Sequence, residues 1–246
     1  MKVTFAGSGD AFGSGGRFQA CILLQDDARP PMLLDCGATS LVALKRQRIN
    51  PSEIAAVFVT HLFVDHFGGV PHLILDGQFS RRTQPLVIAG PIGTETRLMQ
   101  AMEVMFPGSS TATRRFAVNV VELSGDTQPV SVDDVVVRAW EVNPEMEGGP
   151  FLALRVTFGD RTVAYTGDTA WTDAIAEVAD KADLLIAESY FWDKPVPFHL
   201  RYADVVTHRD KLTAARIVLT HMSSEMLSHV EEADFEVAHD GLTLEL

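Results

Sequence analysis

VTHLFVDHFGG, residues 59–69, begins where the buried-type strand AAVFVT (55–60) ends, and it carries three metal-ligating side chains within six residues. In an extended chain, residues two apart point the same way, so His61 and position 63 would face one ion. Asp65 and His66, on the turn beyond, can face a second position. Position 63 holds Phe63, whose ring cannot coordinate. The stretch therefore predicts a metal site with one ligand missing.

Three further segments place polar ligand types directly after apolar strands. They are Thr166–Thr169, which contains Asp168, Glu188–Ser189 and Thr220–His221. Loops at the carboxyl ends of strands converge in α/β folds, so we expect these side chains to meet. A lone histidine is usually structural, but the repetition of His and Asp at strand ends favours a site. Imidazole and carboxylate ligands suit Zn²⁺, Mn²⁺ or Fe²⁺.

Hydrophobic periodicity predicts strands alternating with helices along the whole chain. The expected strands are residues 2–6, 20–25, 32–37, 55–60, 85–90, 116–123, 135–142, 151–158, 161–166, 183–189 and 216–221. The expected helices are residues 40–49, 69–77, 94–106, 171–182, 201–213 and 223–233. This order indicates two sheets packed face to face with helices outside, a four-layer αββα sandwich. We find no low-complexity linker, so residues 1–246 are expected to form a single domain.

The glycine-rich turn GSGDAFGSGG, residues 7–16, could be mistaken for a dinucleotide-binding loop. It misses the G-x-G-x-x-G spacing by one residue, and a strand follows it where that motif needs a helix. We therefore expect a hairpin at the edge of the site.

Composition indicates a packed globular protein, with 46% hydrophobic residues among 246. A run of about 18 apolar residues, as a membrane span needs, is absent from the sequence. The N-terminus reaches glycine too early for a signal peptide's apolar core. Two cysteines, Cys21 and Cys36, give no disulfide framework. A cytoplasmic location is expected, with no membrane partner.

The formal net charge of −13 disfavours a long nucleic-acid partner, because such binding depends on Lys and Arg that neutralise phosphates. The basic pairs Arg81–Arg82 and Arg114–Arg115 are interpreted as solvated surface pairs. A small anionic or ester substrate remains compatible with this charge.

THLFVDH resembles T-H-x-H-x-D-H, the signature of the metallo-β-lactamase superfamily, at every position except the second histidine. GSGDAFGSGGRF, LLDCGATS, YTGDT and LTHMS are similar, in the same order, to segments of its ribonuclease Z-like branch. The resemblance spans essentially the whole chain. It implies an αββα fold, one or two metal ions, hydrolysis often of phosphodiesters, and commonly a homodimer.

Carried over by position, the resemblance divides the centre into two unequal sites. In site one, His61 matches the first histidine and Phe63 replaces the second. The third histidine should follow the strand that ends at 142, where the sequence reads Asn143-Pro144-Glu145. Site one has thus lost two of its three histidines.

Site two is complete in the same comparison, with a bridging carboxylate in place. Its ligands would be Asp65, His66, Asp168 and His221. His61 would complete this site or orient a water, and is counted among the candidate ligands. We expect one divalent ion rather than two, most simply Zn²⁺, with Mn²⁺ or Fe²⁺ as alternatives.

His199, in PVPFHL, matches a histidine that this branch uses near the scissile bond as proton donor or anion stabiliser. Asp65 and His199 are therefore the candidate catalytic residues. Glu188 either hydrogen-bonds to a ligand or is a surface carboxylate. The remaining histidines are expected to be structural or exposed: His72, His208, His229 and His239.

The leading hypothesis is a mononuclear hydrolase of small phosphodiesters or esters that uses a metal-activated water. The alternative is a metal-poor binding or regulatory protein with little catalysis. A redox variant carrying non-haem iron is a third, weaker option. Metal content after purification without chelators discriminates among them.

Overall fold

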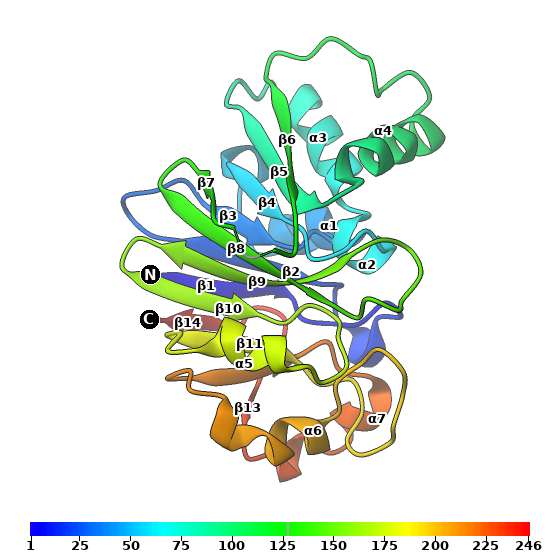
Figure 1. Cartoon of the computed structure of the whole chain (residues 1–246). Coiled ribbons are helices and arrows are strands. Elements are labelled where there is room, and N and C mark those ends of the chain that lie inside the picture. Colours follow the sequence, from blue (N-terminus) through cyan, green and yellow to red (C-terminus); the bar gives the residue numbers. More distant parts are fainter. Residues whose placement is uncertain (127) are drawn as a thin grey trace.

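The computed structural model describes residues 1–126 and 128–246, and its strands form two seven-stranded sheets (Figure 1). The strands of the first sheet are β1 (Lys2–Gly7), β2 (Cys21–Gln25), β3 (Met32–Leu34), β4 (Ala56–Phe58), β5 (Leu86–Pro91), β6 (Val118–Leu123) and β14 (Thr243–Glu245). Their order across the sheet is β14-β1-β2-β3-β4-β5-β6. Strands β3 to β6 run parallel, so their carboxyl ends lie at one edge.

In the second sheet, strands that are consecutive in the chain are neighbours. Its strands are β7 (Val130–Val132), β8 (Val135–Val142), β9 (Phe151–Phe158), β10 (Arg161–Tyr165), β11 (Leu184–Glu188), β12 (Ile217–Thr220) and β13 (Glu236–Val237). Their order across the sheet is β13-β12-β11-β10-β9-β8-β7. Strands β10 to β13 run parallel to one another, whereas β10 is antiparallel to β9. Their carboxyl ends supply the loops that carry Asp168, Glu188 and His221.

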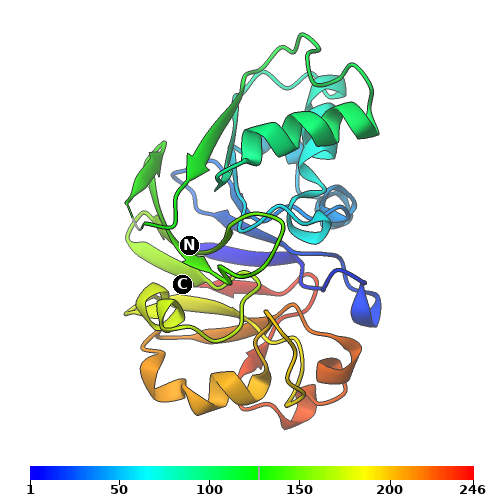
Figure 2. The ribbon, with the colours of Figure 1, turned by 45° about the vertical axis from the view of Figure 1, so that its right-hand side comes forward.

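Helices cover the outer face of each sheet (Figures 1 and 2). On the first sheet these are α1 (Ser40–Arg46), α2 (Val64–Phe67), α3 (Val70–Phe79) and α4 (Thr94–Met105). On the second they are α5 (Asp173–Ala179), α6 (Tyr202–Thr207) and α7 (Ser224–Leu227). One apolar core lies between the sheets, and one lies under each layer of helices. The predicted αββα sandwich is confirmed.

The last strand returns to the first sheet and was not predicted. Strand β14 pairs antiparallel with β1, with Lys2 opposite Glu245, so the two ends of the chain lie side by side (Figure 1). The described strands β7, β13 and β14 have only two or three residues each, too few for a periodic signal.

The last two expected helices are each a short helix followed by a 3₁₀ turn, with a histidine directly before the turn. The helix expected at 201–213 is α6 followed by a 3₁₀ turn at 209–211, and His208 between them stacks on Trp171 with ring centroids 3.8 Å apart. The helix expected at 223–233 is α7 followed by a 3₁₀ turn at 230–232, and His229 stacks on Trp192 at 5.0 Å. Tertiary stacking overrides local helix propensity at both points.

One surface expectation is wrong and concerns Arg82. Its guanidinium is buried and donates hydrogen bonds to the backbone oxygens of Ile54, Gln84 and Pro85. The solvated interpretation fails because these carbonyls replace water as partners.

Within the described residues, the helices lack the length and apolar character needed to cross a bilayer.

Candidate metal centre

Four buried side chains, two from helix α2 and two from loops of the second sheet, converge at the carboxyl edge of the two sheets. The described residues of this cluster are Asp65, His66, Asp168 and His221. His66 Nε2 lies 3.2 Å from His221 Nε2, 3.4 Å from Asp65 Oδ2 and 3.2 Å from Asp168 Oδ1. His221 Nε2 lies 3.2 Å from Asp65 Oδ2. Segments far apart in the sequence thus bring four ligand atoms to one point.

This spacing fits a metal ion, because tetrahedral bonds of about 2.0–2.1 Å set ligand atoms about 3.3 Å apart. Asp168 Oδ1 and His61 Nε2 are buried and have no hydrogen-bond partner in the part of the chain that the structure describes. Buried polar atoms are nearly always satisfied, so such orphans at a cluster of ligands point to a missing partner. The residues present fit one divalent cation.

Asp35 orients His66, and sequence reasoning missed its role. The Asp35 carboxylate accepts a hydrogen bond from His66 Nδ1 at 2.6 Å, which leaves the Nε2 lone pair directed at the cluster. Thr60 holds the same carboxylate through its backbone N–H at 2.8 Å and its hydroxyl at 2.9 Å. Asp35 directly follows the short buried strand β3. The other candidates were identified because they follow apolar strands, and the same pattern could have identified Asp35.

Two glycines allow the Asp35 and His66 segments to cross at short range. A Cβ on Gly69 would lie 2.2 Å from the Gly37 carbonyl oxygen, and one on Gly37 would lie 2.2 Å from the Asp65 oxygen. Cys36 N–H donates to His66 O at 2.7 Å, and Gly69 N–H donates to Cys36 O at 2.8 Å. The backbone contacts therefore fix His66 against Asp35.

His61 lies beside the cluster, and Phe63 fills the space next to it. The His61 Nε2 atom is 3.9 Å from Asp168 Oδ2, the oxygen turned away from His66. The His61 ring stacks on Phe151 with centroids 4.5 Å apart, and Phe63 meets both rings edge-on at 5.2 Å. A Cβ on Gly148 would lie 2.5 Å from the Phe63 ring, so the backbone closes over it. Apolar packing occupies this side of the centre.

Asn143, rather than Pro144, faces the centre where a third site-one histidine was sought. Asn143 is buried, whereas Pro144 is exposed. The Asn143 amide is engaged with backbone groups of the loop that contains Asp168.

Glu188 and His199 form a hydrogen-bonded pair at the open side of the cluster. Glu188 Oε1 accepts from His199 Nδ1 and lies 3.4 Å from His221 Nδ1. Glu188 Oε2 accepts from the backbone N–H groups of Thr169 and Leu200. Glu188 is buried, so its interpretation as a surface carboxylate is wrong. The His199 side chain is 21% exposed, which leaves its ring accessible to a substrate.

The charges of the cluster raise the pKa values of two histidines. Burial opposes protonation, but the negative charge of Asp168 and the carboxylates of Asp65 and Glu188, which accept from the His221 ring, raise the pKa of His221 to about 10. For His66, burial is likewise outweighed by the charges of Asp168, Asp35 and Asp65, and its pKa lies well above the ordinary value.

The other titratable groups of the site shift according to their neighbours. Burial would raise the pKa values of Asp65 and Asp168, but the charges of His66 and His221 lower both. Burial, assisted by the charge of His66, lowers the pKa of His61 to about 3, so His61 is neutral.

The pKa of His199 is raised in this environment. Burial would lower it, but the charge of Glu188 and its hydrogen bond prevail. The His199 ring is therefore protonated to a greater extent near neutral pH than an ordinary histidine.

Four of the eight described non-glycine residues with a left-handed φ lie at the centre. Asp35, Asn143, Phe198 and His221 have φ values of 58°, 51°, 68° and 57°, in the left-handed region that non-glycine residues rarely adopt. Each lies in a loop that carries or neighbours a candidate ligand. Such strain persists only where surrounding contacts fix it, and it is typical of functional sites.

The remaining histidines lie outside the cluster, and two of them stack on the tryptophans described above. His72 contacts the Phe106 ring, and His239 is exposed. The glycine-rich segment lies at the edge of the site as expected, since Ser8 O accepts from His221 N–H at 3.2 Å.

Comparison with known proteins identifies the family. The family model described as Anti-Pycsar protein Apyc1 matches residues 1–239. A ribonuclease Z of Methanosarcina acetivorans is 25% identical over 276 residues, covering 94% of this chain and 90% of the relative.

Solved structures share the fold. Human tRNase Z, short form, superimposes with a TM-score of 0.80 at 24% identity and covers 100% of this chain and 99% of its own. The metallo-β-lactamase fold protein YhfI from Bacillus subtilis gives 0.79 at 21% identity, covering 100% and 98%. The predicted metallo-β-lactamase fold and hydrolase class are confirmed.

The chain therefore belongs to the family described as Anti-Pycsar protein Apyc1, and it is a ribonuclease Z-like, metal-dependent hydrolase of the metallo-β-lactamase superfamily.

Proposed function

We propose that this protein hydrolyses small phosphodiesters with a single divalent ion, most simply Zn²⁺, held by Asp65, His66, Asp168 and His221. The observation that carries the proposal is the convergence of four ligand residues. Three distances from His66 Nε2 and the distance between His221 Nε2 and Asp65 Oδ2 are 3.2–3.4 Å, as expected around one tetrahedral ion. His61 would remain a neutral neighbour of that ion. When bound, such an ion supplies Lewis acidity that lowers the pKa of a water toward neutrality.

The protein's own groups supply orientation and proton transfer. Asp35 holds His66 in the tautomer that presents Nε2, and Glu188 lies within 3.4 Å of the far nitrogen of His221. Asp65 is ionised and can orient an attacking water by accepting a hydrogen bond from it. His199, kept protonated by Glu188, can donate a proton to the leaving oxygen.

Packing around His61 supports one ion rather than two. Phe63 contributes no ligand atom and its ring is wedged between His61, Phe151 and Gly148. Asn143 uses its amide for hydrogen bonds to backbone groups. Of the ligands of site one, only His61 and the bridging Asp168 then remain. Two ligands are too few to hold a second ion at site one.

Charge and length support a small substrate. The net charge of −13 opposes a long polyanion. The alignment with the Methanosarcina relative extends over 276 residues, more than this chain contains, so that relative carries segments that this chain lacks. The name ribonuclease Z describes an RNA substrate for the relative. RNA is therefore included as the competing substrate in the experiment below.

Purified Zn-loaded protein is tested on bis(p-nitrophenyl) phosphate, on a 3′,5′-cyclic nucleotide and on a transfer-RNA precursor with a 3′ extension. We expect turnover of at least one small diester, abolished by Asp168→Ala, with little cleavage of the precursor. Cleavage of the precursor alone would contradict the small-substrate proposal.

The homodimer implied by the resemblance remains a prediction. Phe79 at the end of α3 and Val104 in α4 are 84% and 83% exposed, and they are the residues of this face that the test addresses. Sedimentation equilibrium of the wild type and of Phe79→Glu checks it.

A further inference from the structure

We propose that Asn143 is a positioning residue that ties the loop carrying Asp168 to the segment carrying His199. The inference rests on the proposed function, in which Asp168 is a ligand and His199 a proton donor. Asn143 thereby acquires a role at the place where the resemblance would put a site-one histidine.

The amide of Asn143 bridges two loops that are distant in the sequence. Its Nδ2 donates to the carbonyl oxygens of Asp168 and Phe198, each at 2.9 Å, and its Oδ1 accepts from Ala170 N–H at 3.1 Å. Both N–H groups and the carbonyl are thus in use. Asn143 itself is 9% exposed, so water cannot easily replace these bonds.

The chemistry of this position specifies asparagine. Its φ of 51° lies in the left-handed region, which Asn and Asp tolerate better than other non-glycine residues. Two backbone oxygens require two N–H donors, which aspartate lacks, and the Ala170 N–H requires an acceptor. A planar amide one methylene from the backbone provides all three.

The tether acts on both halves of the site. Asp168 directs Oδ1 to within 3.2 Å of His66, and its backbone oxygen is one end of the tether. Phe198, at the other end, has a strained φ of 68° and directly precedes His199. Without the tether this strain could relax and shift the His199 ring relative to the cluster.

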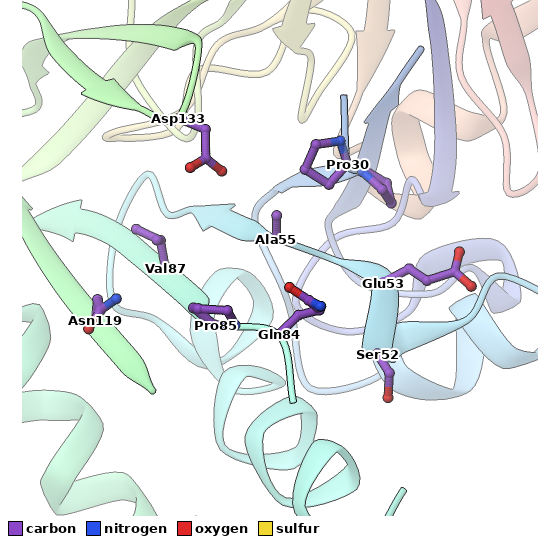
Figure 3. A pocket seen from close by; sticks show the side chains of 10 residues that line it. Pro30, Ser52, Glu53, Ala55, Gln84, Pro85, Val87, Asn119 and Asp133 are labelled. Atoms are coloured by element: carbon purple, nitrogen blue, oxygen red, sulfur yellow. The ribbon is translucent and has the colours of Figure 1, made fainter. Parts of the chain in front are cut away.

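Asn143→Ala and the near-isosteric Asn143→Asp test the tether against Asn119→Ala. Asn119 is exposed, near the start of β6, and lines a cavity of about 610 Å³ at the opposite end of the sheet (Figure 3). Each protein is assayed on bis(p-nitrophenyl) phosphate and on diphenyl phosphate, whose phenolate leaves less readily and depends more on a proton donor. Zn²⁺ affinity is measured separately by competition with a chromogenic chelator.

We expect both Asn143 variants to lose about 10- to 100-fold in kcat on diphenyl phosphate, with KM nearly unchanged. The loss on bis(p-nitrophenyl) phosphate should be several-fold smaller, and Zn²⁺ affinity should fall. Equal losses on both substrates with wild-type Zn²⁺ affinity would reduce Asn143 to a purely structural role and overturn the proposal.

The same set separates this inference from the proposed function. If the wild type hydrolyses neither diester, the proposed function fails. The role of Asn143 is then decided by Zn²⁺ affinity alone. Weaker binding by both Asn143 variants but not by Asn119→Ala would then support the tether to Asp168, and unchanged binding would refute it. Urea unfolding of each variant corrects the comparison for lost stability.

Discussion

Phe63 and His66 belong to one short motif but contribute opposite chemistry to the centre. His66 directs Nε2 into a cluster of buried ligand atoms, while Phe63 packs its ring against His61 and Phe151. The His61 Nε2 lone pair is left without a hydrogen-bond partner among the described residues. In the single-ion proposal, Phe63 is one of the two residues, with Asn143, that leave His61 without companion ligands.

Phe63→His should let a second ion bind, because His61 Nε2 and Asp168 Oδ2 already lie 3.9 Å apart beside position 63. We expect zinc content to rise from about one toward two ions per chain at saturating Zn²⁺. Phe63→Leu, which adds no ligand, is the matched control. Native mass spectrometry that finds one ion in both variants would show that Phe63 does not block the second site.

Asp35→Asn should weaken Zn²⁺ binding about 10- to 100-fold, since His66 would lose the carboxylate that orients it. Asp133→Asn is the control, because Asp133 has a similar left-handed φ of 50° but is exposed on the far cavity (Figure 3). Chelator competition measures both. Equal Zn²⁺ affinities for the two variants would show that Asp35 does not orient His66 for metal binding.

At the scale of elements, the centre depends on the close crossing of the segments after β3 and β4. Gly37 and Gly69 permit this crossing, and each would bring an added Cβ within 2.2 Å of a backbone oxygen. Backbone hydrogen bonds between Cys36, His66 and Gly69 then hold the two segments together. The ligands are therefore placed by backbone geometry as well as by side chains.

Gly69→Ala should destabilise the fold by more than about 3 kcal/mol, since the added methyl meets backbone that cannot move aside cheaply. Gly16→Ala, at a position with open space and a φ of 75°, adds only left-handed strain of about 1–2 kcal/mol. Urea unfolding of both variants gives the difference. A smaller loss for Gly69→Ala than for Gly16→Ala would contradict the crossing argument.

Sequence reasoning succeeded where a polar residue follows a long buried strand. Asp168, Glu188 and His221 were found because each ends an apolar run of β10, β11 or β12. The role of Asn143 could not be read in this way, since its three partners are backbone groups 25 to 55 residues away. His208, directly after α6, and His229, two residues after α7, stack on tryptophans, and local propensity does not encode such contacts.

At the scale of the whole molecule, the two sheets bring opposite charges together in a buried place. Without a metal, the charges of Asp65 and Asp168 raise the pKa values of His66 and His221, and the charges of the two histidines lower the pKa values of the two carboxyl groups. The raised pKa of His221, about 10, adds stability to the metal-free protein that is complete below pH 6.5. That stability is lost as pH rises toward 10.

Metal binding should release protons at pH 7, since the raised pKa values of His66 and His221 keep protons on this pair of rings that must leave before both rings can coordinate. His61, with a pKa of about 3, contributes none. Apparent Zn²⁺ affinity should therefore rise with pH between about 6.5 and 8. Titration calorimetry in buffers of different ionisation enthalpy counts the protons, and a count near zero would contradict the assigned ligands.

The number of metal ions bound per chain decides whether the centre holds a single ion. Wild-type protein is purified without chelators, saturated with Zn²⁺, freed of excess metal by gel filtration and analysed by elemental analysis and native mass spectrometry. One ion per chain is the predicted result. Two ions per chain, or only trace metal, would contradict the account of a single-ion centre built from Asp65, His66, Asp168 and His221.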